Sequence, residues 1–139
     1  MPMPIRFNGG EIDLSPRLGF SAAVVASPAL NAETIIAQIT LRNDVALQSG
    51  IVVVGYAAFL VGASGTAVQF RIRRTDVSGT VVKASGALNV TAADLRTQTI
   101  VGVDTGISPL NAVYCLTMIV TAGGAESTVS AVTLAALVV

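Results

Sequence analysis

Short β-forming runs separated by turn signals recur along this chain, and their spacing restricts the fold more than any other feature. Val, Ile, Thr and Ala dominate the runs, whereas Gly, Asn, Asp, Ser and Pro gather between them. The first group favours strands and the second favours turns. We expect strands at 20–26, 34–41, 51–61, 67–74, 80–84, 97–103, 112–121 and 127–139. About eight strands at this spacing predict an all-β fold, a jelly-roll-like antiparallel β-sandwich.

The chain divides into an N-terminal segment and one domain. Residues 1–20 contain three prolines and a Gly-Gly pair, which suppress regular structure, so we expect an extended arm or a loosely paired first strand. Residues 21–139 have the size of a single β-sandwich domain. The one helical signal, at 91–94, indicates a single turn between two strands.

Alternation of apolar and polar residues predicts which strand faces point inward. Residues 68–73 alternate strictly, as in a strand with one face on the core and one in water. The expected inward residues are Val68, Phe70, Ile72, Ile35, Ile39 and Val53.

Three of the expected strands, at 51–61, 112–121 and 129–139, are apolar on both faces. In a two-layer sandwich one face of each strand meets water, so such strands need a second cover. Another copy of the chain is the simplest cover. The interface is expected on the strand at 112–121, at Tyr114, Leu116, Met118 and Val120.

The composition supports association. The chain is 53% hydrophobic and 12% charged, whereas ordinary soluble domains are about 25% charged. Apolar surface beyond the needs of one core favours a partner surface. We expect a homo-oligomer, a trimer or else a dimer.

Charge and hydropathy exclude other partners. The formal net charge is zero, whereas nucleic-acid binders need an excess of Lys and Arg. Residues 45–70 carry no charge, but their apolar core at 51–63 is shorter than the ~20 residues of a membrane span. Residues 1–19 carry four charges and no long apolar stretch, so no secretion signal is expected.

Few residues offer chemistry. The chain has no His and one cysteine, Cys115, so an internal disulfide and a Cys/His zinc site are excluded, and Cys115 is expected to be a buried apolar residue. The tripeptide Asp104-Thr105-Gly106 resembles the catalytic loop of aspartic proteases, but it is also an ordinary strand-to-turn sequence. Asp76 and Asp94 are expected to be solvated turn carboxylates, like Asp104, rather than calcium ligands. We therefore predict no catalytic, metal or cofactor residues, and no enzyme.

The arginines at 71, 73 and 74 form the one local basic cluster. They are expected on the water-facing side of an amphipathic strand, where positive charge discourages edge pairing. The alternative is a salt bridge to Glu33 or Asp44 of a neighbouring subunit.

The order and spacing of the strands from residue 34 to 139, with late apolar strands at 114–121 and 127–139, resemble a known family. They are similar to tumour-necrosis-factor-like single jelly rolls, most of all the trimeric decoration (cement) proteins of tailed-bacteriophage capsids. The resemblance implies a trimer with apolar strands at its axis, attached to a shell through an arm or its base, in a virion assembled in the host cytoplasm. The low aromatic content, 4%, departs from the family's aromatic axis clusters.

The predicted function is therefore that of a structural, non-enzymatic virion protein that oligomerises and stabilises a shell. The alternative is a carbohydrate- or receptor-binding β module. Sugar binders usually offer exposed aromatic platforms, whereas Tyr56 and Tyr114 lie within apolar runs and Trp is absent.

The N-terminal segment is the expected attachment arm to a shell protein. It carries spaced apolar anchors, and residues 11–15 alternate like a strand that adds to an exposed sheet edge. The alternative is an ordinary first strand of the same subunit. The expected partner-binding residues are Ile5, Phe7, Ile12, Leu14 and Leu18.

Overall fold

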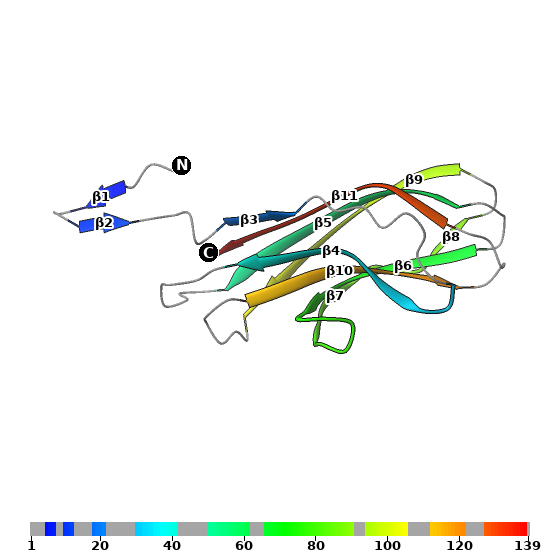
Figure 1. Cartoon of the computed structure of the whole chain (residues 1–139), viewed down its shortest axis with the longest axis horizontal. Coiled ribbons are helices and arrows are strands. Elements are labelled where there is room, and N and C mark those ends of the chain that lie inside the picture. Colours follow the sequence, from blue (N-terminus) through cyan, green and yellow to red (C-terminus); the bar gives the residue numbers. More distant parts are fainter. Residues whose placement is uncertain are drawn as a thin grey trace.

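The chain is an antiparallel β-sandwich, which confirms the predicted fold class (Figure 1). The computed structural model describes residues 5–7, 10–12, 18–21, 30–41, 50–61, 66–90, 94–105, 112–121 and 127–138. All the regular structure within these ranges is β. No helix within them is long and apolar enough to cross a membrane.

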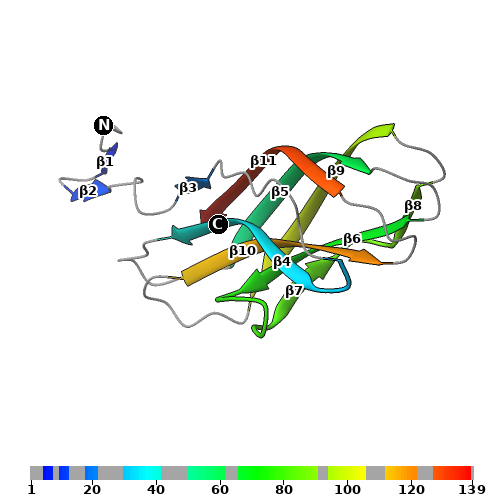
Figure 2. The same cartoon turned by 45° about the vertical axis from the view of Figure 1, so that its right-hand side comes forward.

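Two sheets form the layers of the sandwich (Figures 1 and 2). The first sheet, which we call the polar sheet for its outer face, contains β4 (Glu33–Leu41), β10 (Ala112–Thr121), β6 (Thr66–Arg74), β7 (Val81–Ala84) and β8 (Leu88–Val90). Its order is β4-β10-β6-β7, and β8 pairs with β6 beyond the end of β7.

The second sheet, which we call the apolar sheet, has the order β3-β11-β5-β9. Its strands are β3 (Leu18–Ser21), β11 (Ser127–Val138), β5 (Ile51–Val61) and β9 (Asp94–Asp104). A separate hairpin, β1 (Ile5–Phe7) and β2 (Gly10–Ile12), lies beyond the end of the sandwich near the C-terminus (Figure 1).

Seven of the predicted strands coincide with β4, β5, β6, β7, β9, β10 and β11 to within a few residues. The eighth, at 20–26, overlaps β3, and its residues after Ser21 lie outside the described part of the chain. The three residues of β8 were not predicted, because a run so short has no readable period. Of the expected helical turn, only Asp94 is described, and it begins β9.

The core lies between the inner faces of the sheets. Phe59 of β5 and Phe70 of β6 are fully buried, and their ring centroids lie 5.2 Å apart at an angle of 55°. Tilted aromatic pairs at this separation are favourable beyond the area that they bury. Gly55 allows the sheets to approach, because a Cβ there would lie 2.9 Å from a methyl of Leu116.

A β-bulge in β4 makes one of the six predicted inward residues wrong. Val68, Phe70, Ile72, Ile39 and Val53 belong to the core as predicted. Ile35 does not, because the pairing shifts between Leu116, which lies opposite Ala37, and Thr117, which lies opposite Ile35. The extra residue, Ile36, enters the core and Ile35 turns outward to lie opposite Thr117, since a bulge reverses the alternation of a strand.

The inter-sheet aromatic pair gives a first prediction. Phe59→Ala removes a fully buried ring between the sheets, so we expect the free energy of unfolding to fall by about 3–5 kcal/mol. Urea titration followed by circular dichroism measures this change. Val81→Ala, at an exposed position of β7 on the polar sheet, is the matched control and should change stability by less than about 0.5 kcal/mol. Equal losses in the two variants would contradict this placement of the core.

Candidate functional site

The four residues expected at an oligomer interface lie inside the single chain. The side chains of Tyr114, Leu116, Met118 and Val120 point between the two sheets and are at most 1% exposed. A side chain that is covered by its own subunit has no surface left for a second copy. The structure therefore corrects this choice of residues, and an interface must use other parts of the surface.

The outer face of β10 is also covered by its own chain. Its outward residues Cys115 and Thr117 are fully buried, although β10 lies in the middle of the polar sheet. Long side chains from the neighbouring strands β4 and β6 lie over them. Burial raises the pKa of the Cys115 thiol to about 11, which agrees with the expected inert, buried cysteine.

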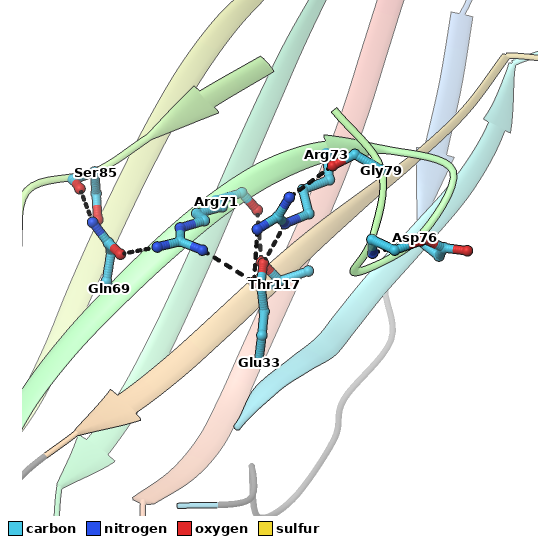
Figure 3. A network of polar contacts seen from close by, with 9 residues as sticks. Glu33, Gln69, Arg71, Arg73, Asp76, Gly79, Ser85 and Thr117 are labelled. Carbon is cyan, nitrogen blue, oxygen red and sulfur yellow. Dashed lines mark hydrogen bonds and ion pairs between the residues drawn. The ribbon is translucent and has the colours of Figure 1, made fainter. Parts of the chain in front are cut away.

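A hydrogen-bond network centred on Glu33 provides this cover (Figure 3). The Glu33 carboxylate accepts hydrogen bonds from Nε and Nη2 of Arg73, at 2.6 and 2.8 Å, and from Nη1 of Arg71 at 3.1 Å. The Thr117 hydroxyl donates to the same carboxylate at 2.5 Å. The sequence left open whether the arginines pair with Glu33 of a neighbouring subunit. Arg71 and Arg73 both form ion pairs with Glu33 of their own subunit. Asp44 lies outside the described residues.

The network is electrostatically favourable although it is largely buried. Desolvation alone would raise the pKa of Glu33, but hydrogen bonds from Arg73 and Thr117 and the charges of both arginines outweigh it and lower the pKa below its ordinary value. The hydrogen bond to Glu33 likewise raises the pKa of Arg73. Two further guanidinium donors have partners: Arg73 Nη1 donates to the Gly79 carbonyl and Arg71 Nη2 donates to Oε1 of Gln69. We interpret this network as a structural cover for β10.

Arg74, the third arginine of the cluster, joins the two sheets. It is the last residue of β6, and it pairs with Asp104, the last residue of β9, through both carboxylate oxygens. The Tyr114 hydroxyl donates to the same carboxylate at 2.9 Å. Burial and this contact with Asp104 raise the pKa of Tyr114. The Asp104 side chain is 4% exposed and the Arg74 side chain 33%, so the pair is a partly buried inter-sheet ion pair.

This geometry argues against protease chemistry at Asp104-Thr105-Gly106. An aspartic protease needs two carboxylates that share a proton beside a water molecule. Asp104 instead pairs with the Arg74 guanidinium and accepts a hydrogen bond from the Tyr114 hydroxyl, and its side chain is only 4% exposed.

The three aspartates considered as calcium ligands do not converge. Asp94 and Asp104 are at opposite ends of β9, and the Asp76 carboxylate accepts hydrogen bonds from Ser78 in the turn after β6. Those bonds lower the pKa of Asp76. Within the described part of the chain, no group of three or more His, Cys, Asp or Glu residues is placed to hold a metal ion.

The outer face of the apolar sheet is the candidate functional site. Every outward position of β5, β9 and β11 is uncharged. Two adjacent rows across the three strands are wholly aliphatic: Leu137–Val52–Val103 and Ala135–Val54–Val101. Val101 and Val103 are 49% and 57% exposed. We call these two rows the apolar patch.

A third row continues the patch with a polar character. Tyr56 lies there between Thr99 and Thr133, and its side chain is 37% exposed. Both tyrosines lie in apolar strands, as expected, but their exposure differs. Tyr114 is buried in the core, whereas Tyr56 reaches the surface.

Sequence reasoning found part of this site. It identified 51–61 and 129–139 as apolar on both faces, but it assigned the uncovered face to β10. It passed over β9, although the uninterrupted run Ile100-Val101-Gly102-Val103 was a signal of apolarity on both faces. Sequence alone did not show that the arginines and Glu33 cover β10 and leave β5 uncovered.

The expected arm residues fall into different structural settings. Ile5, Phe7 and Ile12 belong to the β1–β2 hairpin, in which Ile5 lies opposite Ile12 and Arg6 opposite Glu11. Leu18 belongs to β3 and pairs with Leu137 at the edge of the apolar sheet. Leu14 lies outside the described residues.

Comparison with known proteins shows a likeness of fold only. Neither a protein-family model nor a curated protein matches the sequence. Among solved structures, the chain is similar to a protein chain in the structure of the infectious bursal disease virus Gx strain. The TM-score is 0.59 and the sequence identity is 16%, and the match covers 97% of this chain and 37% of the viral chain. The VP2 subviral particle of infectious bursal disease virus gives a TM-score of 0.57 and 15% identity over 97% and 38% of the two chains.

These neighbours are viral particle proteins, and their folds agree with the predicted jelly-roll-like sandwich. The present chain spans less than two-fifths of their length. The narrower resemblance to tumour-necrosis-factor-like decoration proteins does not follow from them.

The Glu33 network predicts a pH dependence of stability. Since the folded pKa of Glu33 is below the ordinary 4.5, its contribution is fully present above that pH and is lost as pH falls through the folded pKa. Glu33→Gln should lower the free energy of unfolding by about 2 kcal/mol at neutral pH, because it leaves two adjacent guanidiniums without a counter-charge. Urea titrations at several pH values should show the difference from the unmodified protein shrinking in acid. Lys83→Gln, an exposed charged residue of β7, is the control, and an equal loss there would contradict the prediction.

The inter-sheet ion pair gives a third prediction. Asp104→Asn removes the carboxylate from Arg74 and should cost about 2–3 kcal/mol in urea titration, since the remaining buried polar groups are only partly satisfied. Tyr114→Phe removes one hydrogen bond and should cost about 1 kcal/mol. If Asp104→Asn leaves stability unchanged but abolishes a peptide-cleaving activity, the protease interpretation replaces ours.

Proposed function

We propose that this protein is a non-enzymatic structural subunit that self-associates in the assembly of a virion-type protein shell. The observation that carries the proposal is the apolar patch, an exposed and uncharged area on a sheet whose inner face already forms the core. Exposed apolar patches rimmed by polar residues mark interaction surfaces.

The polar groups of the molecule support the same function. Glu33, Arg71 and Arg73 stabilise one sheet, and Arg74 with Asp104 joins the two sheets. In this arrangement the ionisable groups that drew attention in the sequence have structural partners. These groups therefore support a structural role for the protein, in which its surfaces act by packing against other proteins.

The fold likeness supports a shell as the setting. The similar structures are of particles of infectious bursal disease virus, and a jelly-roll-like sandwich presents flat, rigid faces that suit lateral packing. In its narrower form, the proposal is a decoration or cement protein of a bacteriophage capsid, as the sequence resemblance implies. That resemblance also implies a trimer, which the measured mass distinguishes from a dimer.

The β1–β2 hairpin is the proposed attachment arm. Positions two apart in a strand share a face, so the register places Ile5, Phe7 and Ile12 on one face of the hairpin and Arg6 and Glu11 on the other. Figures 1 and 2 both show the hairpin apart from the sandwich. An isolated two-stranded hairpin is marginal in water, and a neighbouring subunit or shell protein would supply the surface that it lacks.

One observation favours the second function, a carbohydrate- or receptor-binding module. Tyr56 is an exposed aromatic side chain flanked by Thr99 and Thr133, and aromatic faces stack on the apolar faces of sugars. The aliphatic rows beside it fit a protein surface better than a polar sugar, so we rank this function second.

Light scattering and electron microscopy of the purified full-length chain test the proposal. We expect a defined homo-oligomer at micromolar concentration and regular higher assemblies as concentration rises. Ile5→Asp with Ile12→Asp should leave the fold and the basic oligomer intact but suppress the higher assemblies. The matched control is Arg6→Ser with Glu11→Ser, on the opposite face of the hairpin. A monomer that binds components of a glycan array, and loses them on Tyr56→Ala, would replace the proposal with the second function.

A further inference from the structure

We infer that two copies of this chain pack face to face through the outer faces of their apolar sheets, with the apolar patch and its Val54 inside the contact. This inference rests on the proposed self-association and adds to it the surface and its occupant. It replaces Tyr114, Leu116, Met118 and Val120 as the interface.

The size of the face suits a protein partner. Strands β5 and β9 each have eleven residues, and β11 has twelve. At about 3.3 Å per residue and about 4.8 Å between strands, the three strands present about 500 Å² in projection. Adding β3 and the relief of the side chains brings the area toward the ~800 Å² per partner of a standard interface.

The chemistry of the face selects a second copy as the occupant. A partner of opposite charge has nothing to recognise there, since all outward positions of β5, β9 and β11 are uncharged. The complementary surface must itself be flat, apolar and without charge. Among the described surfaces of this molecule, the outer face of the polar sheet fails that test, because Glu33, Arg71 and Arg73 lie across it. The apolar patch of another copy meets it.

The geometry of sheets favours the same occupant. Two sheets pack well face to face when their twists match, with strands about 30° apart and the layers about 10 Å apart. Two copies of one sheet have the same twist. A two-fold pair then brings each patch against its equivalent, and Val54, on the central strand β5 with Val101 and Ala135 on either side, lies near the middle.

Substitutions on the patch test the inference by light scattering of the full chain. Val54→Lys and Val101→Lys should weaken self-association by about tenfold or more, because each buries an unpaired charge. Val101→Thr keeps the β-branched shape and should weaken it less. The matched control is Thr40→Lys, at an exposed position of β4 on the polar sheet, and it should leave the mass unchanged. Circular dichroism confirms that each variant is folded.

A charge-pairing experiment distinguishes a second copy from other occupants. Val54→Lys and Val54→Glu should each be monomeric alone, whereas their equimolar mixture should recover the dimer mass, because equivalent positions of the two copies lie together. If the Val54 and Val101 variants are folded and keep the oligomer mass, this inference is wrong, and the proposed self-association uses another surface. A monomeric unmodified chain would overturn both. Loss of association without recovery in the mixture would show that the patch meets a different surface.

Discussion

The contact between the inner faces of the two sheets, where Phe59 meets Phe70 and Gly55 admits Leu116, is the interaction on which the other features of this protein depend. Aliphatic side chains of modest size fill the space around this contact. Because each buries little area, many strands contribute residues to the core. Because both sheets commit one face to this core, the surfaces that the described strands leave for function are the two outer faces, the edges and the N-terminal hairpin.

The two outer faces differ in how far their apolar residues are shielded from water. On the polar sheet, Glu33 and two arginines bridge three strands and shield Cys115 and Thr117, so an apolar strand is covered without a second subunit. On the apolar sheet no charged side chain occupies an outward position of β5, β9 or β11. That face is thus the one where association gains most, because apolar area leaves water there without stripping charges of their solvent.

The ion pair of Arg74 with Asp104 shows why a local motif is a poor guide to chemistry. The same aspartate that begins an Asp-Thr-Gly tripeptide is held by a guanidinium and by the Tyr114 hydroxyl at the junction of the sheets. In that setting the carboxylate links one sheet to the other through Arg74 and Tyr114. Its role depends on residues 30 positions before it and ten after it in the chain.

The sequence by itself determined the long strands, because turn residues and β-branched runs act locally, and it determined the inward residues of β6, whose alternation is unbroken. It did not predict the short strand β8. It also showed that β5 and β11 are apolar on both faces. Only the tertiary structure decided which of those faces stays uncovered. The bulge at Ile36, the reach of Glu33 to arginines about forty residues away, and the pairing of β5 with β9 and β11 all depend on strand register. Register depends on how the apolar patterns of two strands match and on the turns that join them, so the pattern of a single strand is not enough to give it.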